Sequence, residues 1–239
     1  MKKPSPKITL TWFGHSAFLL ESPSGKRVLV DPWLDNPKSP PWATSITGVH
    51  VICVTHGHDD HLGNTIELAP RNNAQVVCNH EVGLYLKSKG LTAVHGINKG
   101  GTTDVGGILV TMVDARHSGS LDVQSPPLPG GEAAGYVIRF ENGYRAYHAG
   151  DTCVFGDMQL IGRLYKPDLA LVPIGDYYTM GPREAAYACT LIKPKTIIGM
   201  HYGTDPVLTG TPELLKKHLP ASMRKMVRVL EIGIPVPLG

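Results

Sequence analysis

The feature that most constrains this chain is an apolar run that ends in a cluster of histidines and aspartates. Residues 49–55, VHVICVT, are apolar and rich in β-branched side chains, which is typical of a strand buried on both faces. Three histidines and two aspartates then fall within positions 56–61. Such titratable groups are costly to place beside a buried strand. The pattern therefore predicts a strand end whose loop carries a functional site.

The spacing inside this cluster favours metal binding. His56 and His58 are two residues apart, so in a partly extended loop both imidazoles can bind one cation. Asp60 and His61 follow as the chain turns toward a helix, and they can face a second cation. A polar helix cap would explain an aspartate here but neither His56 nor His58. Because imidazole and carboxylate groups are preferred ligands of zinc, manganese, nickel and iron, we expect a metal site.

Three more apolar runs along the chain end in the same way. The segments VDARHS, YHAGDT and IGMHYG carry His117, Asp151 and His201 directly after predicted strands. Loops at strand ends are where a rigid scaffold presents functional groups. Four such ends, each with a potential metal ligand, predict convergence on one point.

The order of predicted elements indicates an α/β fold. A β-meander punctuated by Gly, Ser and Pro comes first, and strands alternating with short helices follow. Strands are expected at 7–13, 17–22, 26–32, 49–55, 74–79, 167–176, 195–203 and 226–233, with a strand entering a loop over 107–118 and a hairpin over 135–152. Helices are expected at 62–70, 80–90, 158–165, 181–192 and 211–219, and loops at 36–48 and 118–134. No linker divides the chain, so we expect one domain over residues 1–239, with at least two sheets and helices outside.

Composition restricts the partners. The 239 residues are 42% hydrophobic and 18% charged, which predicts a sizeable core. The net charge of +3 comes from scattered Lys and Arg, so no nucleic acid partner is expected. No apolar stretch reaches the ~18 residues of a membrane span, and no secretory signal is recognisable. The four cysteines are far apart and are expected to be reduced. We expect a cytoplasmic protein with a small-molecule substrate. The sequence is compatible with a homo-oligomer and does not specify the oligomeric state.

The motifs resemble those of a known superfamily. The segment HGHDDH at 56–61 is similar to the HxHxDH signature of the metallo-β-lactamase superfamily. The flanking segments TWFGHSAFLLES, VLVDPWL, HAGDT and PDLALVPIGDYYTMGP resemble uncharacterised metal-dependent hydrolases related to L-ascorbate-6-phosphate lactonase. The resemblance covers nearly the whole chain. It implies the metallo-β-lactamase αββα sandwich, in which two mixed β-sheets pack face to face with helices outside.

The same resemblance implies a dinuclear metal site. Seven side chains would bind two divalent cations: His56, His58 and His117 at one, Asp60, His61 and His201 at the other, and Asp151 between them. Zinc, manganese, nickel and iron all suit these ligands. A hydroxide bridging the metals would be the nucleophile, because metal coordination lowers the pKa of water from ~15.7 toward ~7. Asp60 or Asp151 would accept or guide a proton.

Four further residues are candidates for roles around the metals. His15, in FGHS, is expected in the pocket or against a ligand, or else as a turn histidine. Asp31 either orients a ligand imidazole or starts a turn. Asp176 and Tyr178, in IGDYYTMGP, either line the substrate pocket, with Asp176 bonded to a metal-site histidine, or form an ordinary loop.

The favoured function is a metal-dependent hydrolase acting on a small ester-like substrate, either a phosphodiester or a lactone. An iron-dependent redox enzyme on the same fold is an alternative, and a non-catalytic metal-binding scaffold is another. All seven expected ligands are present, which argues against the scaffold. Metal analysis and a visible absorption spectrum would separate the first two.

Overall fold

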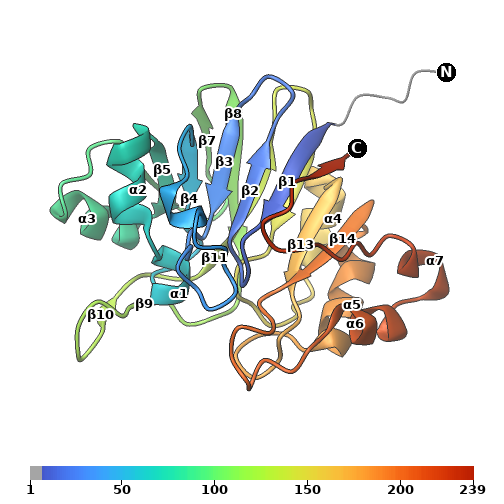
Figure 1. The fold of residues 1–239 in the computed structure, drawn as a ribbon. Coiled ribbons are helices and arrows are strands. Elements are labelled where there is room, and N and C mark those ends of the chain that lie inside the picture. Colours follow the sequence, from blue (N-terminus) through green and yellow to red (C-terminus); the bar gives the residue numbers. More distant parts are fainter. Residues whose placement is uncertain (1–6) are drawn as a thin grey trace.

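Two mixed β-sheets packed face to face form the middle of the molecule, and helices cover both outer faces (Figure 1). The structure is a computed structural model that describes residues 7–239, so the first six residues of the expected domain lie outside it. The predicted αββα arrangement is confirmed. None of the helices within residues 7–239 has both the length and the apolar character of a membrane span.

The first sheet has seven strands in the order β15-β1-β2-β3-β4-β5-β6. These are β1 (Ile8–Trp12), β2 (Phe18–Glu21), β3 (Arg27–Val30), β4 (Val51–Cys53), β5 (Gln75–Asn79), β6 (Val94–Ile97) and β15 (Val236–Leu238). The predicted meander is confirmed, because β1, β2 and β3 pair antiparallel. From β3 to β6 the pairing is parallel, so these strands end at the same edge.

The second sheet has six strands in the order β14-β13-β12-β11-β8-β7. They are β7 (Thr102–Val105), β8 (Ile108–Asp114), β11 (Ala134–Arg139), β12 (Arg145–His148), β13 (Leu169–Pro173) and β14 (Thr196–Met200). The predicted hairpin is the antiparallel pair β11 and β12. Both β8 and β12 run antiparallel to β11, and β12, β13 and β14 are parallel, so β8 and these three strands share one direction. A separate small hairpin, β9 (Ser120–Leu121) with β10 (Leu128–Pro129), lies in the loop after β8.

The helices lie on opposite sides of the sandwich (Figure 1). On the first sheet these are α2 (Thr65–Asn72) and α3 (His80–Ser88); on the second, α4 (Met158–Tyr165), α5 (Pro182–Ile192) and α6 (Pro212–His218). Short helices are α1 (Asp59–Leu62), α7 (Ala221–Arg224) and a 3-10 turn at Ala43–Ser45. Local chemistry sets their starts: the Asn79 side chain accepts the Val82 N–H at 2.8 Å to begin α3.

The core between the sheets is built from alternate, fully buried side chains of both. Leu10 and Leu20 of the first sheet belong to one buried cluster with Val110 and Ile138 of the second. The Tyr136 hydroxyl of β11 crosses the interface and donates to the Val54 carbonyl at 2.8 Å. Val54 directly follows β4 and begins the loop that carries His56 and His58. This bond therefore fixes the start of that loop against the opposite sheet.

The structure differs from the sequence predictions at several elements. The strand predicted over 226–233 is wrong: only Val227 forms an isolated bridge, and the last strand is β15. The helix predicted over 62–70 is divided into α1 and α2 at Gly63. There a Cβ would lie 2.5 Å from the Pro32 carbonyl oxygen, so the close approach of the two segments needs glycine. Strands β6 and β7 were not predicted, because their side chains are mostly exposed or half-buried.

Two tyrosines test how the sheets are joined. Tyr136→Phe removes a buried hydroxyl that donates to Val54, and we expect it to lower the free energy of unfolding by about 1 kcal/mol. The Tyr147 hydroxyl is also buried but has no hydrogen-bond partner among residues 7–239, so Tyr147→Phe should cost nothing or stabilise slightly. Urea unfolding followed by circular dichroism measures both. An equal loss in the two variants would contradict this account.

Candidate metal centre

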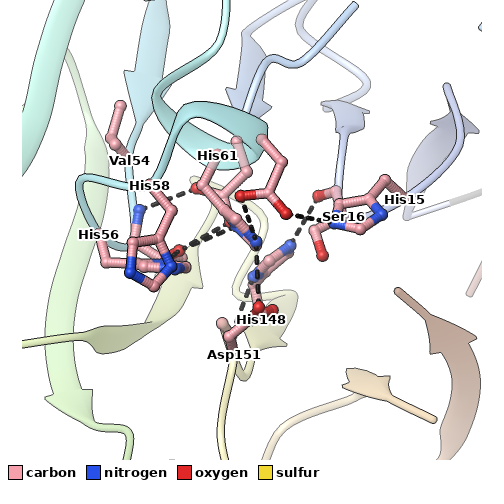
Figure 2. A network of polar contacts seen from close by, with 12 residues as sticks. His15, Ser16, Val54, His56, His58, His61, His148 and Asp151 are labelled. Atoms are coloured by element: carbon pink, nitrogen blue, oxygen red, sulfur yellow. Dashed lines mark hydrogen bonds and ion pairs between the residues drawn. The ribbon is translucent and has the colours of Figure 1, made fainter. Parts of the chain in front are cut away.

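The seven predicted ligands come together at the edge of the sandwich where the strands end. Figure 2 shows four of them there: His56, His58, His61 and Asp151. The loop after β4 carries His56 and His58, α1 carries Asp60 and His61, and the loops after β8, β12 and β14 carry His117, Asp151 and His201. Since parallel strands bring their carboxyl ends to one edge, residues far apart in the sequence meet there.

Three histidines form the first group. One ring nitrogen from each of His56, His58 and His117 lies within 4.8 Å of the others, and His56 Nε2 is 2.9 Å from His58 Nδ1. His56 is buried, whereas His58 and His117 are half-buried. The intervening Gly57 is required sterically, because a Cβ there would lie 2.6 Å from the Ser120 carbonyl oxygen of the small hairpin.

A second group contains one more histidine than expected. Asp60, His61 and His201 are joined by His15, and their ligand atoms all lie within 4.8 Å of one another. His15 Nε2 lies 3.0 Å from Asp60 Oδ2, and its Nδ1 lies 2.6 Å from Thr204 Oγ1. With a neutral ring, Nε2–H donates to Asp60 and Nδ1 accepts from the threonine hydroxyl. The structure therefore places His15 against a predicted ligand.

Asp151 lies between the two groups. Its Oδ2 is 2.9 Å from His201 Nε2, 3.2 Å from His61 Nε2 and 3.8 Å from His117 Nε2. A third compact set, His56, His61 and Asp151, shares members with both groups. One carboxylate is thus within reach of imidazoles from each.

Asp31 fixes the orientation of His61. Its Oδ2 lies 2.7 Å from His61 Nδ1, and its Oδ1 accepts the Thr55 N–H at 2.8 Å. Both Asp31 and His61 are completely buried. With Nδ1 bonded to this carboxylate, His61 Nε2 faces Asp151 (Figure 2). A carboxylate on the far nitrogen of a histidine is the arrangement that metal-binding histidines commonly have.

The chemistry of these groups fits divalent cations. Asp151 Oδ1 is buried and has no hydrogen-bond partner among residues 7–239, and the contact of His61 Nε2 with Asp151 Oδ2 at 3.2 Å leaves Oδ1 free. An unsatisfied buried polar atom costs free energy, so native structures normally provide it with a partner. A cation between the groups would supply that partner, and neutral imidazoles with carboxylates form the ligand set that zinc, manganese, nickel and iron accept.

Burial and mutual charges shift the titration of the cluster. Burial lowers the pKa of His56, and the neighbouring imidazole of His61 lowers it further. Burial opposes ionisation of Asp151, yet the imidazoles of His201 and His61 hold the pKa of its carboxyl well below its usual range. Burial likewise opposes protonation of His61, but the surrounding carboxylates raise its pKa well above 6.5. A carboxylate kept ionised among imidazoles is prepared for cations.

A pocket of about 600 Å³ opens beside the cluster. His15, Asp60, His117, Asp151 and His201 contribute to its wall, as does Tyr178. The structure places Asp176 outside the pocket: it is exposed, and its carboxylate accepts the Tyr177 N–H at 2.7 Å.

Several residues of this pocket were missed in the sequence. Thr204 and Asp205 follow His201 by three and four positions, so proximity to a predicted ligand was the available signal. Trp33 and Asp122 come from loops whose paths the sequence does not reveal. His148, beside Asp151 in Figure 2, is outside the ligand groups, and its Nε2–H donates to the Ser16 carbonyl at 2.9 Å.

The buried His15 predicts a pH dependence for the metal-free protein. Burial lowers the pKa of His15 from 6.5 to about 4, although its bond to Asp60 opposes the shift. Between these values the unfolded chain takes up a proton that the folded chain does not, so His15 makes stability fall as pH drops from 6.5 to 4. We expect His15→Gln to flatten the pH dependence of the unfolding free energy by up to about 3 kcal/mol.

Urea unfolding at several pH values across this window measures the effect, with the exposed His218→Gln as the control. Parallel pH profiles for the wild type and His15→Gln would show that His15 is not a buried neutral imidazole.

Comparison with known proteins shows similarity to a beta-lactamase superfamily domain and to metal-dependent hydrolases. Residues 26–202 match the family model of the beta-lactamase superfamily domain. A UPF0173 metal-dependent hydrolase of Koribacter versatilis is 48% identical over 211 residues, which cover 88% of this chain and 91% of the relative. One of Methanosarcina mazei is 47% identical over 97% of this chain and 99% of the relative. A solved metallo hydrolase of Ignicoccus hospitalis is 34% identical, with a TM-score of 0.86 over 97% of this chain and 98% of that one.

Proposed function

Because the chain belongs to the beta-lactamase superfamily and to the UPF0173 metal-dependent hydrolases, we propose that it hydrolyses a small ester-like substrate with two divalent cations. The position of Asp151 is the observation that carries the proposal. Its Oδ2 is within 3.8 Å of imidazoles from both histidine-rich groups, as a ligand shared by two cations would be. The cytoplasmic location and the single-domain organisation stay predictions from the sequence.

The proposed ligand sets follow the two groups. His56, His58 and His117 would hold one cation, Asp60, His61 and His201 would hold the other, and Asp151 would be available to both. When bound, such cations lower the pKa of water from ~15.7 toward ~7 and polarise a carbonyl or phosphoryl oxygen.

The side chains themselves orient the site and handle protons. Asp31 holds His61 in place through its 2.7 Å contact, and Thr55 in turn bonds Asp31. Burial opposes ionisation of Asp60, but His61 and His15 keep the pKa of its carboxyl low, so Asp60 stays ionised at neutral pH. Asp60 also lines the pocket, where it can accept a hydrogen bond from an attacking water.

Both ester classes predicted from the sequence, phosphodiesters and lactones, suit this chemistry, because each presents an oxygen that a cation can polarise. Neither class needs a serine or cysteine nucleophile. Of the four cysteines, Cys53, Cys78 and Cys189 are buried, and Cys153 is exposed but lies outside the pocket.

Replacing Asp151 tests the proposal. We expect Asp151→Ala and the isosteric Asp151→Asn to lose bound metal and turnover together. Turnover should fall by at least about 100-fold, since even residues that only support metal ligands cost 10- to 100-fold. Metal is quantified by mass spectrometry, and turnover is measured with p-nitrophenyl esters and phosphodiesters.

Asp157→Ala is the matched control, because Asp157 is an exposed aspartate at the start of α4 whose side chain makes no capping bond. Folding of each variant is checked by circular dichroism. Full activity in folded Asp151→Asn would reject the shared-ligand assignment, and bound iron with a visible absorption band would favour the redox alternative.

A further inference from the structure

The pocket beside the metal groups has an unusual charge pattern. Five aspartates line it, Asp59, Asp60, Asp122, Asp151 and Asp205, and among residues 7–239 no lysine or arginine does. The chain as a whole carries a net charge of +3, so this excess of negative charge is local. A cleft lined by charge of one sign concentrates its field on whatever enters.

Two bound cations would not reverse this pattern. They would bring four positive charges into a pocket with five carboxylates. Two of these, Asp60 and Asp151, lie in the ligand groups, which leaves three other aspartates in the pocket lining: Asp59, Asp122 and Asp205. An anionic substrate would therefore meet repulsion from these carboxylates as well as attraction to the cations.

Two basic side chains near the pocket, those of Arg116 and Lys99, are engaged with other residues. The Arg116 guanidinium lies 5.1 Å from the centre of the Phe155 ring and 3.7 Å from Asp114. Lys99 is paired with Asp114 at 2.5 Å and with Glu132 at 2.9 Å. Phosphate recognition normally uses bidentate arginine or a lysine point charge, and neither lines this pocket.

Two of the three remaining aspartates lie in loops. Asp122 lies beside the small hairpin and accepts the Ser120 hydroxyl at 2.6 Å. Asp205 follows His201 and accepts the Val207 N–H at 2.9 Å. Both side chains are exposed residues of the pocket wall. Local turn bonds alone would be satisfied equally by an asparagine oxygen, so the turns do not require the charge.

The uncharged part of the wall is apolar and aromatic. Trp33 is half-buried, Leu208 is buried, and Pro37 and Tyr178 are exposed at the opening. These surfaces suit an alkyl or aromatic group, and the tryptophan and tyrosine rings also attract cations.

Resting on the hydrolase proposed above, we infer that the pocket selects uncharged or cationic carboxylic esters and lactones and discriminates against anionic esters such as phosphodiesters. In the reaction, water adds across the acyl C–O bond: the hydroxyl goes to the acyl carbon, and the leaving oxygen takes the proton. The acid product ionises at neutral pH, and the surrounding carboxylates then favour its release.

Three p-nitrophenyl esters that share one scissile bond and chain length test the inference: hexanoate, 6-trimethylammoniohexanoate and 6-sulfohexanoate. Sulfonate is chosen because it is a weak metal ligand. We expect kcat/KM for the metal-loaded protein to be at least about tenfold lower for the sulfonate than for the hexanoate at low salt. The difference should shrink in 0.5 M NaCl, where screening is strong.

Binding of the three matching amides, measured by calorimetry, gives a readout that does not need turnover. The trimethylammonio amide and hexanamide should bind more tightly than the sulfonate. The Asp122→Asn/Asp205→Asn double variant should reduce the preference at least about threefold in both measurements. A control double variant, Glu67→Gln/Asp157→Asn, removes two exposed charges outside the pocket and should leave the preference unchanged.

The two proposals fail in different ways. Turnover of all three esters with equal or better use of the sulfonate would overturn the charge selection and leave the hydrolase standing. If no ester is hydrolysed, the ester-hydrolase proposal fails, and the amides alone decide the charge preference. Equal binding of the three amides, or no binding of any, would overturn it.

Discussion

One buried chain of polar contacts, from Asp31 through His61 to Asp151, joins the two sheets at the functional edge. Asp31 follows β3 of the first sheet, and Asp151 follows β12 of the second. His61 lies between them, 2.7 Å from one carboxylate and 3.2 Å from the other. All three residues are buried, so their charges interact in an environment of low dielectric. The site therefore depends on the packing of the two sheets, because His61 can contact both Asp31 and Asp151 only when the sheets are packed together.

Three residues of the site have backbone conformations that residues other than glycine rarely adopt. His15, Asp31 and His201 all have positive φ, at 49°, 46° and 56°. Each such residue costs of order 1–3 kcal/mol and persists only where the surroundings hold it. The surroundings do so here: the His201 N–H donates to the His15 carbonyl at 3.0 Å, and so does the Trp12 indole N–H. These hydrogen bonds hold the loops that carry the His15 and His201 imidazoles against each other.

The sequence indicated the proposed ligands better than the pocket that surrounds them. The pattern of His56 and His58 predicts metal binding, because a pair of histidines directly after a buried strand has few structural uses. Their convergence with His117 and His201 was expected because each follows an apolar strand; the structure achieves it by packing the two sheets with these strand ends at the same edge. For His15 the sequence left two alternatives, a residue near the metals or an ordinary turn histidine, because a single histidine in a turn forms no repeating pattern. Asp122 and Asp205 lie in loops whose course depends on tertiary packing, and the strand expected at 226–233 formed only one bridge, at Val227.

The most direct test of the account is to locate bound metal in crystals of the zinc-loaded protein by anomalous scattering at the zinc edge. Two peaks are expected, one among His56, His58 and His117 and the other among Asp60, His61 and His201, with Asp151 within bonding distance of both. A single peak, or peaks that leave Asp151 without a metal contact, would contradict the claim that this carboxylate joins two cations.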